Sequence, residues 1–331
     1  MKKILPLQQK TKSESVRAYN DLFANISYYI DTKLKHRGIH DLIVQVFQGD
    51  IKKNKVLDIG CGYGRFSFIA STFADKVVGI DLTEGAISIA NKIKNSLDVN
   101  NIEFICSSIE DFHSEEKYDF IILSGTLEHL HNESDMLKKI NELLTEDGVF
   151  ITDSPSEFNF RGIFHASLWK LFNFPMTLTD VRIITPESMN KMAKDAGFKV
   201  DKIIGTLYKR GWSDAGTTDI KSRMKNVMQD VGEKMKDFTI SHNNYEEWVD
   251  EAENIFNPLM EDWKKSGVLR EIPAVDSYGY KLNKEYLESE GLPADKIEQY
   301  MTPDFSIDPY YCMQEPYNLL GGNNIYVLRK I

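Results

Sequence analysis

Between residues 51 and 153 the chain alternates short runs of β-branched and other apolar residues with segments whose apolar positions follow a helical period. This alternation is typical of parallel β-strands joined by right-handed crossover helices. We therefore predict a doubly wound α/β sheet. In such a sheet the functional residues collect at the carboxyl ends of the strands.

Turn and capping signals extend this pattern beyond residue 153. Residues 145–148, Thr-Glu-Asp-Gly, predict a turn before a fifth strand at 149–153. Thr185 followed by proline predicts the start of a helix that should end near Gly197. Residues 198–204 would then form a sixth strand.

Helical periodicity also marks both flanks of this core. Apolar residues at helical spacing predict amphipathic helices over 220–238 and 248–263, the second with a kink at Pro258. Such faces are most often ordinary core, although a substrate lid or a dimer interface would show the same pattern. Residues 13–50 also read as helical.

The segment 55–65 predicts a strand that runs into a glycine-rich turn and then into a helix. Gly60, Gly62 and Gly64 allow a tight turn that a ligand can approach closely. Asp58 precedes them and would repel a pyrophosphate, whereas it suits a ligand that carries an ammonium group.

The spacing of the glycines narrows the choice of ligand further. A dinucleotide fingerprint needs a third glycine at the position of Arg65. Its absence disfavours a nicotinamide or flavin dinucleotide. S-adenosylmethionine, which carries an ammonium group and no phosphate, fits both observations.

With three later segments, this turn makes the chain resemble the class I S-adenosylmethionine-dependent methyltransferases, a family that includes ubiquinone and sugar O-methyltransferases. Residues 76–81, Lys-Val-Val-Gly-Ile-Asp, look like the second strand of that family. Residues 101–109 look like the third strand and the turn beside the adenine, and 117–125 like the fourth strand. Glu128 and His129 follow, where the family often has a Glu-His pair.

The resemblance implies a seven-stranded, mostly parallel, Rossmann-like sheet with an antiparallel last strand, for which 324–330 is the best match. More than a hundred residues separate this strand from the sixth, so we expect an insertion. The expected organisation is an N-terminal helical cap (1–50), a cofactor-binding core (51–207), a mainly helical insertion (208–322) and a final core strand (323–331).

The resemblance also implies where the cofactor lies. Asp81 would take the ribose hydroxyls, and Ser108, where the family usually has aspartate, would lie beside the adenine. Tyr19 on the N-terminal segment would cover the sulfonium, or else belong to a helix that simply packs on the sheet. Arg37 and Arg65 would each reach the carboxylate or else be solvated surface charges. The expected cofactor-binding residues are Tyr19, Arg37, Asp58, Gly60, Cys61, Gly62, Arg65, Asp81, Leu82, Ser108, Ile109 and Ser124.

Methyl transfer to a hydroxyl requires alignment of the reacting groups, exclusion of water and a base. His129 follows the fourth strand and is our first candidate for the base, with His165 as the second. A purely structural role for His129 is left open. The residues expected near the acceptor are Glu128, Glu157, Arg161 and Tyr311.

Composition limits the partners. The chain of 331 residues has a formal net charge of -10, which argues against nucleic acid. No apolar run approaches the roughly 20 residues that span a bilayer, and the apolar stretch among the first eight residues is too short for a secretory signal, so we expect a cytoplasmic protein without a membrane partner. The three cysteines lack metal or redox spacing and no compact carboxylate cluster is present, so we expect no metal.

The sequence thus predicts a methyltransferase that uses S-adenosylmethionine to methylate a hydroxyl of a small molecule. The acceptor would be a sugar, an aromatic metabolite or a natural-product intermediate, attacked in line with a histidine as general base. Two alternatives stay open: N-methylation of a small amine held by Asp153 or Glu157, and a cofactor-binding scaffold without catalysis. A homodimer through the insertion is a further option.

Overall fold

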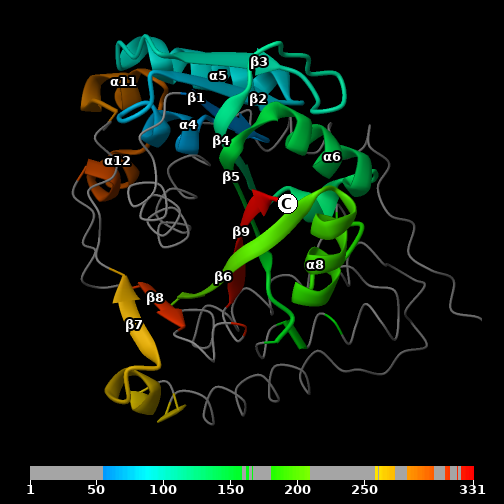
Figure 1. Cartoon of the computed structure of the whole chain (residues 1–331). Coiled ribbons are helices and arrows are strands. Elements are labelled where there is room, and N and C mark those ends of the chain that lie inside the picture. Colours follow the sequence, from blue (N-terminus) through cyan, green and yellow to red (C-terminus); the bar gives the residue numbers. More distant parts are fainter. Residues whose placement is uncertain are drawn as a thin grey trace, which may run out of the picture.

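The computed structural model describes residues 55–158, 162–163, 166, 180–208, 258–259, 261–272, 282–301, 310–313, 319 and 322–331. These residues form a nine-stranded sheet with helices packed on its two faces (Figure 1). The strand order is β3-β2-β1-β4-β5-β9-β6-β8-β7. Outside the described residues lie the predicted N-terminal cap, the helix over 220–238, and four predicted site residues: Tyr19, Arg37, Arg161 and His165.

The first half of the sheet is parallel, as the alternating pattern predicts. Strands β3, β2, β1, β4 and β5 pair in parallel in that order. Their bounds are Lys55–Ile59 for β1, Lys76–Asp81 for β2, Ile102–Cys106 for β3, Tyr118–Ser124 for β4 and Leu144–Pro155 for β5. The helices between them are α4 (Arg65–Ala70), α5 (Glu84–Ser96), the short 3-10 helix η1 (Leu127–His129) and α6 (Glu133–Leu143).

The predicted antiparallel last strand is confirmed. Strand β9 (Asn323–Lys330) lies between β5 and β6 (Phe198–Tyr208) and runs antiparallel to both. The polypeptide therefore leaves the sheet after β6 and returns to its middle at the very end of the described chain, which brings Asn323 and Asn324 beside Ser154 and Pro155.

Two short strands were not predicted. Strand β8 (Tyr310–Met313) pairs with the edge of β6, and β7 (Leu269–Ile272) pairs with β8. Both come from the segment expected to be mainly helical, which also forms α11 (Lys284–Ser289) and α12 (Ala294–Met301). Four residues are too few to show a β-alternation, so pairing with an existing sheet edge determines their conformation.

The capping signals before the sixth strand are confirmed. Helix α8 spans Pro186–Asp195, and the Thr185 side chain accepts a hydrogen bond from the Ser188 amide at 3.0 Å. In return the Ser188 hydroxyl is 2.8 Å from the Thr185 amide, which completes a capping box. The helix ends at Asp195, close to the predicted Gly197, whose φ is +79°.

The predicted turn at 145–148 is wrong. These residues lie within β5, because Tyr118 pairs with Leu144 while Phe120 already pairs with Val149. The residues between the two pairs form an irregularity in the strand. A bulge uses the same polar and glycine residues as a turn, so the local sequence cannot tell the two apart.

The core has two layers, one on each face of the sheet. Helices α4, α5, α11 and α12 contribute to the cluster that contains Phe68, Ile93, Leu287 and Ile297. Helices α6 and α8 pack on the opposite face through residues such as Met189. Because the central strands are buried on both faces, a ligand can approach them only at the strand ends.

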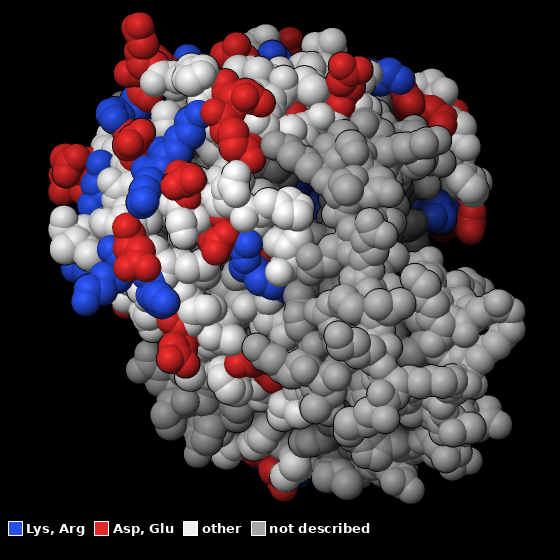
Figure 2. Space-filling model, turned by 90° about the vertical axis from the view of Figure 1, so that its right-hand side faces the viewer, with Lys and Arg blue, Asp and Glu red and all other residues white. Residues whose placement is uncertain are grey.

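Acidic and basic side chains are interspersed on the described part of the face shown in Figure 2. No helix in the described part of the chain has both the length and the apolar character that crossing a membrane requires. The expectations about nucleic acid and about cellular location stay predictions.

Candidate active site

The turn after β1 is fixed to the end of β2 by backbone hydrogen bonds. The amides of Gly60 and Cys61 both donate to the carbonyl of Ile80, at 2.8 and 3.0 Å, and the amide of Gly64 donates to the carbonyl of Cys61 at 2.8 Å. The turn therefore has a single conformation, set by the neighbouring strand.

Two of the glycines are required by both conformation and space. Gly60 and Gly64 have φ values of +69° and +79°. A Cβ atom at Gly60 would lie 2.7 Å from the Thr126 hydroxyl oxygen, and one at Gly64 would lie 2.3 Å from the ring of Phe104. Gly60 is thus explained by contact with the loop after β4, and Gly64 by contact with β3.

Asp58 is directed toward helix α4. Its Oδ2 atom accepts hydrogen bonds from the Ser67 amide at 3.0 Å and from the Ser67 hydroxyl at 2.7 Å. Burial raises the pKa of Asp58 to about 7, although the bonds from Ser67 favour the ionised form. The carboxylate occupies the start of the helix, where a pyrophosphate would otherwise bind. Contact between Asp58 and the ammonium group of a cofactor stays a prediction.

Asp81 at the end of β2 closes the turn from the other side. Its Oδ2 accepts from the Gly62 amide at 2.9 Å, and its Oδ1 accepts from the Thr83 amide at 2.8 Å and the Thr83 hydroxyl at 2.6 Å. Three of roughly four acceptor positions are therefore occupied within the protein. At least one remains for a ligand hydroxyl.

The turn after β3 is stabilised by its own side chains. The hydroxyl of Ser108 donates to the Asp111 carboxylate at 2.7 Å, and the Asp111 amide donates back to that hydroxyl at 3.1 Å. Ser108 is buried and its hydroxyl is engaged locally, while Leu82 is 40% exposed beside Asp81. Contact of either residue with an adenine stays a prediction.

A second polar group joins the ends of β4, β5 and β9. The Ser124 hydroxyl donates to Asp153 Oδ1 at 2.5 Å, and Asn323 donates to Asp153 Oδ2 at 3.3 Å. Burial raises the pKa of Asp153. Both oxygens of Asp153 have partners inside the protein, and its expected role in holding an amine stays a prediction.

His129 lies on η1, next to a carboxylate that the sequence analysis did not identify. Its Nδ1 atom is 3.1 Å from Asp180 Oδ1, and its Nε2 atom is 4.0 Å from Glu128 Oε1. The amide of Val181 donates to the carbonyl of Glu128 at 2.9 Å, which holds the segment before α8 across η1. No sequence spacing could reveal this pair, because Asp180 comes from a separate segment.

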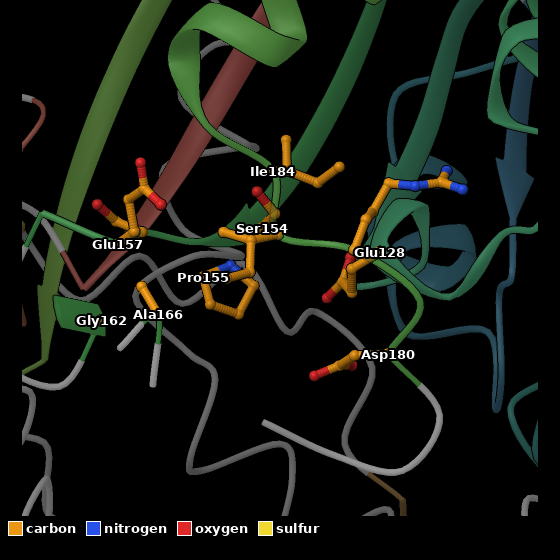
Figure 3. A pocket seen from close by; sticks show the side chains of 11 residues that line it. Glu128, Ser154, Pro155, Glu157, Gly162, Ala166, Asp180 and Ile184 are labelled. Carbon is orange, nitrogen blue, oxygen red and sulfur yellow. The ribbon is translucent and has the colours of Figure 1, made fainter. Parts of the chain in front are cut away.

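A hollow opens beside this pair (Figure 3). Its volume is about 410 Å³, including space open to solvent. In the view of Figure 3, Glu128 and Asp180 lie to one side of Pro155, and Glu157 lies to the other. The described lining residues are Glu128, Ser154, Pro155, Ser156, Glu157, Gly162, Ala166, Asp180, Arg182, Ile183 and Ile184.

Glu128 is almost fully enclosed at the edge of this hollow. Burial raises its pKa to about 7, and the charges of Asp180 and Asp153 add to the shift, while His129 opposes it. No group of three or more His, Cys, Asp or Glu residues in the described segments is arranged to hold a metal ion. Of the predicted acceptor residues, Glu128 and Glu157 line the hollow, Tyr311 belongs to β8, and Arg161 lies outside the described residues.

Comparison with known proteins identifies methyltransferases that are similar in sequence to this chain. The malonyl-acyl-carrier-protein O-methyltransferase of Bacillus cereus is 28% identical over 148 residues, which are 44% of this chain and 54% of the relative. The (S)-tetrahydroprotoberberine N-methyltransferase of Eschscholzia californica is 29% identical over 113 residues, 34% of this chain and 32% of the relative. The chain thus spans about half the length of the first curated relative and about a third of the second.

A solved structure with the same fold is that of the 4+2 cyclase SpnF, with a TM-score of 0.50, 12% identity and 98% coverage of both chains. At that identity the likeness concerns the fold alone. Residues 51–265 match the sequence model of a family described as a methyltransferase domain. Since this match covers well over half of the 331 residues, the chain belongs to the class I S-adenosylmethionine-dependent methyltransferase family.

Proposed function

We propose that the protein transfers a methyl group from S-adenosylmethionine to a hydroxyl of a small molecule. One observation carries the proposal: the glycine turn with Asp81 and the histidine–carboxylate pair with its hollow follow neighbouring parallel strands. Strands β1 and β4 are paired and parallel, so both regions lie at one edge of the sheet. A donor in the first region and an acceptor in the second would meet there.

The residues of the first region fit this cofactor. Asp81 accepts from a ribose hydroxyl, Leu82 offers apolar surface to the adenine, and the backbone amide of Ile109 contributes to adenine recognition. The turn amides of Gly60, Cys61 and Gly62 already have acceptors inside the protein, which suits a nucleoside without phosphates. When bound, S-adenosylmethionine supplies a methyl group that is already activated for transfer. We retain Asp58, Arg65 and Ser124 as further contacts in this proposal.

In the second region His129 acts as the general base. In this proposal Asp180, whose Oδ1 atom lies 3.1 Å from Nδ1 of His129 without hydrogen-bond geometry, accepts the Nδ1–H after a small rotation of the ring. This fixes the tautomer and leaves Nε2 to take the proton of the acceptor hydroxyl. The Asp180 carboxylate then stabilises the imidazolium that forms. Asp180 is a positioning residue in this scheme, since it acts through His129.

Replacement of His129 tests the proposal most directly. We expect His129→Gln to lower turnover by roughly 10²- to 10⁴-fold while binding of S-adenosylhomocysteine stays unchanged. Asp180→Asn should lower turnover less and shift the acidic limb of the pH–rate profile, because the imidazole loses its negative partner. Near-normal turnover in His129→Gln, with cofactor bound, would remove the base from the proposal.

The same variant separates this function from N-methylation. A neutral amine is nucleophilic without a base, so an amine acceptor would still be methylated by His129→Gln. The N-methyltransferase among the relatives keeps this second function in consideration. A scaffold without catalysis would bind S-adenosylhomocysteine but methylate neither hydroxyls nor amines.

A further inference from the structure

Three residues that line the hollow each carry a buried polar atom without a hydrogen-bond partner among the described residues: Glu128 Oε2, Ser154 Oγ and Arg182 Nη1. Only 8% of Glu128 and 1% of Ser154 are exposed. Such groups are rare in folded proteins, because a buried polar atom without a partner is strongly unfavourable. Their convergence on one hollow indicates that a ligand completes them.

The three groups differ in what they need from a ligand. The Glu128 carboxylate needs a hydrogen-bond donor, the Arg182 guanidinium needs an acceptor, and the Ser154 hydroxyl can use either. An ammonium group could satisfy Glu128 but has nothing to offer Arg182. A hydroxyl can both donate and accept, so a ligand with several hydroxyls satisfies all three.

Charge around the hollow argues against an anionic ligand. Glu128, Asp180 and Glu157 all line it. The positive charge of Arg182 is shared with Glu133, whose carboxylate lies 2.7 Å from Nη2. A phosphate or carboxylate would therefore meet three acids and one guanidinium that is already paired.

The described part of the walls offers no stacking partner to a flat aromatic ligand. The apolar residues among the described lining are aliphatic: Pro155, Ala166, Ile183 and Ile184. Aromatic ligands are usually held by stacking against aromatic side chains. A planar ring at this wall would leave Glu128 and Ser154 unpaired.

The polar character continues behind Ser154. Asn324 of β9 pairs with Ser154 of β5 in the sheet, and its side-chain amide is buried without a hydrogen-bond partner in the described part of the chain. Tyr326, the next residue on this face of β9, interacts with both side chains, although none of the three meets hydrogen-bond geometry. Ser154 is thus the end of a buried polar row on the side of the hollow, and a ligand hydroxyl would extend this row.

We propose that the hollow binds a neutral, polyhydroxylated, non-aromatic acceptor of the sugar or polyol class. One hydroxyl donates to Glu128 Oε2, a neighbouring oxygen accepts from Arg182 Nη1, and a third hydroxyl meets Ser154. This inference rests on the proposed function, which makes the hollow the acceptor site. It goes further in naming the substrate class and the residues that select it.

Binding of small probes by saturation-transfer NMR, with S-adenosylhomocysteine present, tests the inference. The probes are methyl α-D-glucopyranoside, myo-inositol, catechol and benzylamine. We expect the wild-type protein to bind a polyol more tightly than catechol or benzylamine. Glu128→Leu should weaken polyol binding at least tenfold, and Ser154→Ala several-fold. Glu103→Gln, an exposed acid on β3, is the matched control and should bind like the wild type.

Two results would overturn the inference: tighter binding of catechol or benzylamine than of either polyol, or polyol binding that both variants leave unchanged. Calorimetry with S-adenosylhomocysteine on the same samples separates the two proposals. Normal binding of S-adenosylhomocysteine with failed polyol binding refutes the substrate class alone. Absence of S-adenosylhomocysteine binding refutes the proposed function and the substrate class with it. Thermal melting of each variant shows that it is folded.

Discussion

The turn after β1 and the hollow after β5 lie at the same edge of the sheet, yet their buried polar groups are arranged in opposite ways. In the turn, the amides of Gly60, Cys61 and Gly62 have acceptors within the protein, and the Asp58 carboxylate accepts hydrogen bonds from Ser67. In the hollow, Glu128, Ser154 and Arg182 each present an atom that has no hydrogen-bond partner among the described residues.

The fold alone supplies hydrogen-bond partners to the polar groups of the turn, whereas a ligand must supply those of the hollow. The turn is held by backbone bonds to β2, so its shape does not depend on the cofactor. The hollow keeps polar groups whose partners must come from the acceptor, at a cost in stability to the free protein. We infer that cofactor binding is preorganised and that selection of the acceptor depends on a few buried polar side chains.

The largest effect is expected from Gly64→Ala, which tests how rigid the turn is. The new Cβ would combine an unfavourable φ of +79° with overlap on the Phe104 ring, which is itself packed against Phe68. We expect a loss of about 3 kcal/mol in the free energy of unfolding and weaker binding of S-adenosylhomocysteine.

Gly267→Ala is the matched control, because its φ is +77° and no atom lies within 4 Å of the new Cβ. It should be destabilised by about 1 kcal/mol, from the backbone conformation alone. Equal losses in the two variants, measured by urea denaturation, would show that the turn is not tightly packed against β3.

Ser67→Ala tests whether the hydrogen bond from the Ser67 hydroxyl stabilises the buried carboxylate of Asp58. The change removes the hydroxyl that donates to the buried carboxylate and should destabilise the protein by about 1–3 kcal/mol. Ser71→Ala also removes a buried hydroxyl, but one that donates only to the carbonyl of Phe68, so about 1 kcal/mol is expected. A larger loss for Ser71→Ala than for Ser67→Ala in urea denaturation would contradict the role given to Asp58.

Glu128→Gln tests the hollow. The substitutions in the turn should lower the free energy of unfolding, whereas this one should raise it at pH 8. The pKa of Glu128 is raised from 4.5 to about 7 in the folded protein, so its contribution is most favourable below pH 4.5 and is lost as pH rises toward 7. Without acceptor, glutamine should therefore stabilise the protein at pH 8, by about 1–3 kcal/mol, and much less at pH 5.

Melting temperatures of wild type and Glu128→Gln at pH 5 and pH 8 measure this change. Asp58, whose pKa is also raised, contributes the same pH dependence to both proteins and cancels from the difference. A difference between the two proteins that does not change with pH would show that Glu128 is not the buried acid of the hollow.

The smallest effect is expected away from both regions. Glu146 is 3.0 Å from Lys330 but its side chain is 89% exposed. Glu146→Gln should change the free energy of unfolding by less than about 1 kcal/mol and leave binding of S-adenosylhomocysteine unchanged. A larger change would mean that stability differences among the other variants cannot be assigned to the two regions.

The sequence predicted those parts of the fold that depend on local pattern. Apolar runs and capping residues located the parallel strands and the ends of α8, because burial and caps act on neighbouring residues. It missed β7 and β8, whose conformation depends on pairing with the edge of β6. It also mistook an irregularity in β5 for a turn, because both use the same residues.

The candidate site divides in the same way. The glycine turn and Asp81 were found because the spacing of glycines and the acid at the end of β2 are local features. Asp180 was missed because its contact with His129 depends on a separate segment that crosses η1. The unpaired atoms of Ser154 and Arg182 could not be predicted either, since hydrogen-bond satisfaction depends on the complete tertiary structure.

Calorimetric titration of the purified protein with S-adenosylhomocysteine tests the central claim most directly, that the turn after β1 and Asp81 bind this nucleoside. We predict saturable binding at a single site, weakened at least tenfold in Asp81→Ala. No binding of S-adenosylhomocysteine or S-adenosylmethionine, with clear binding of NAD under the same conditions, would contradict the account.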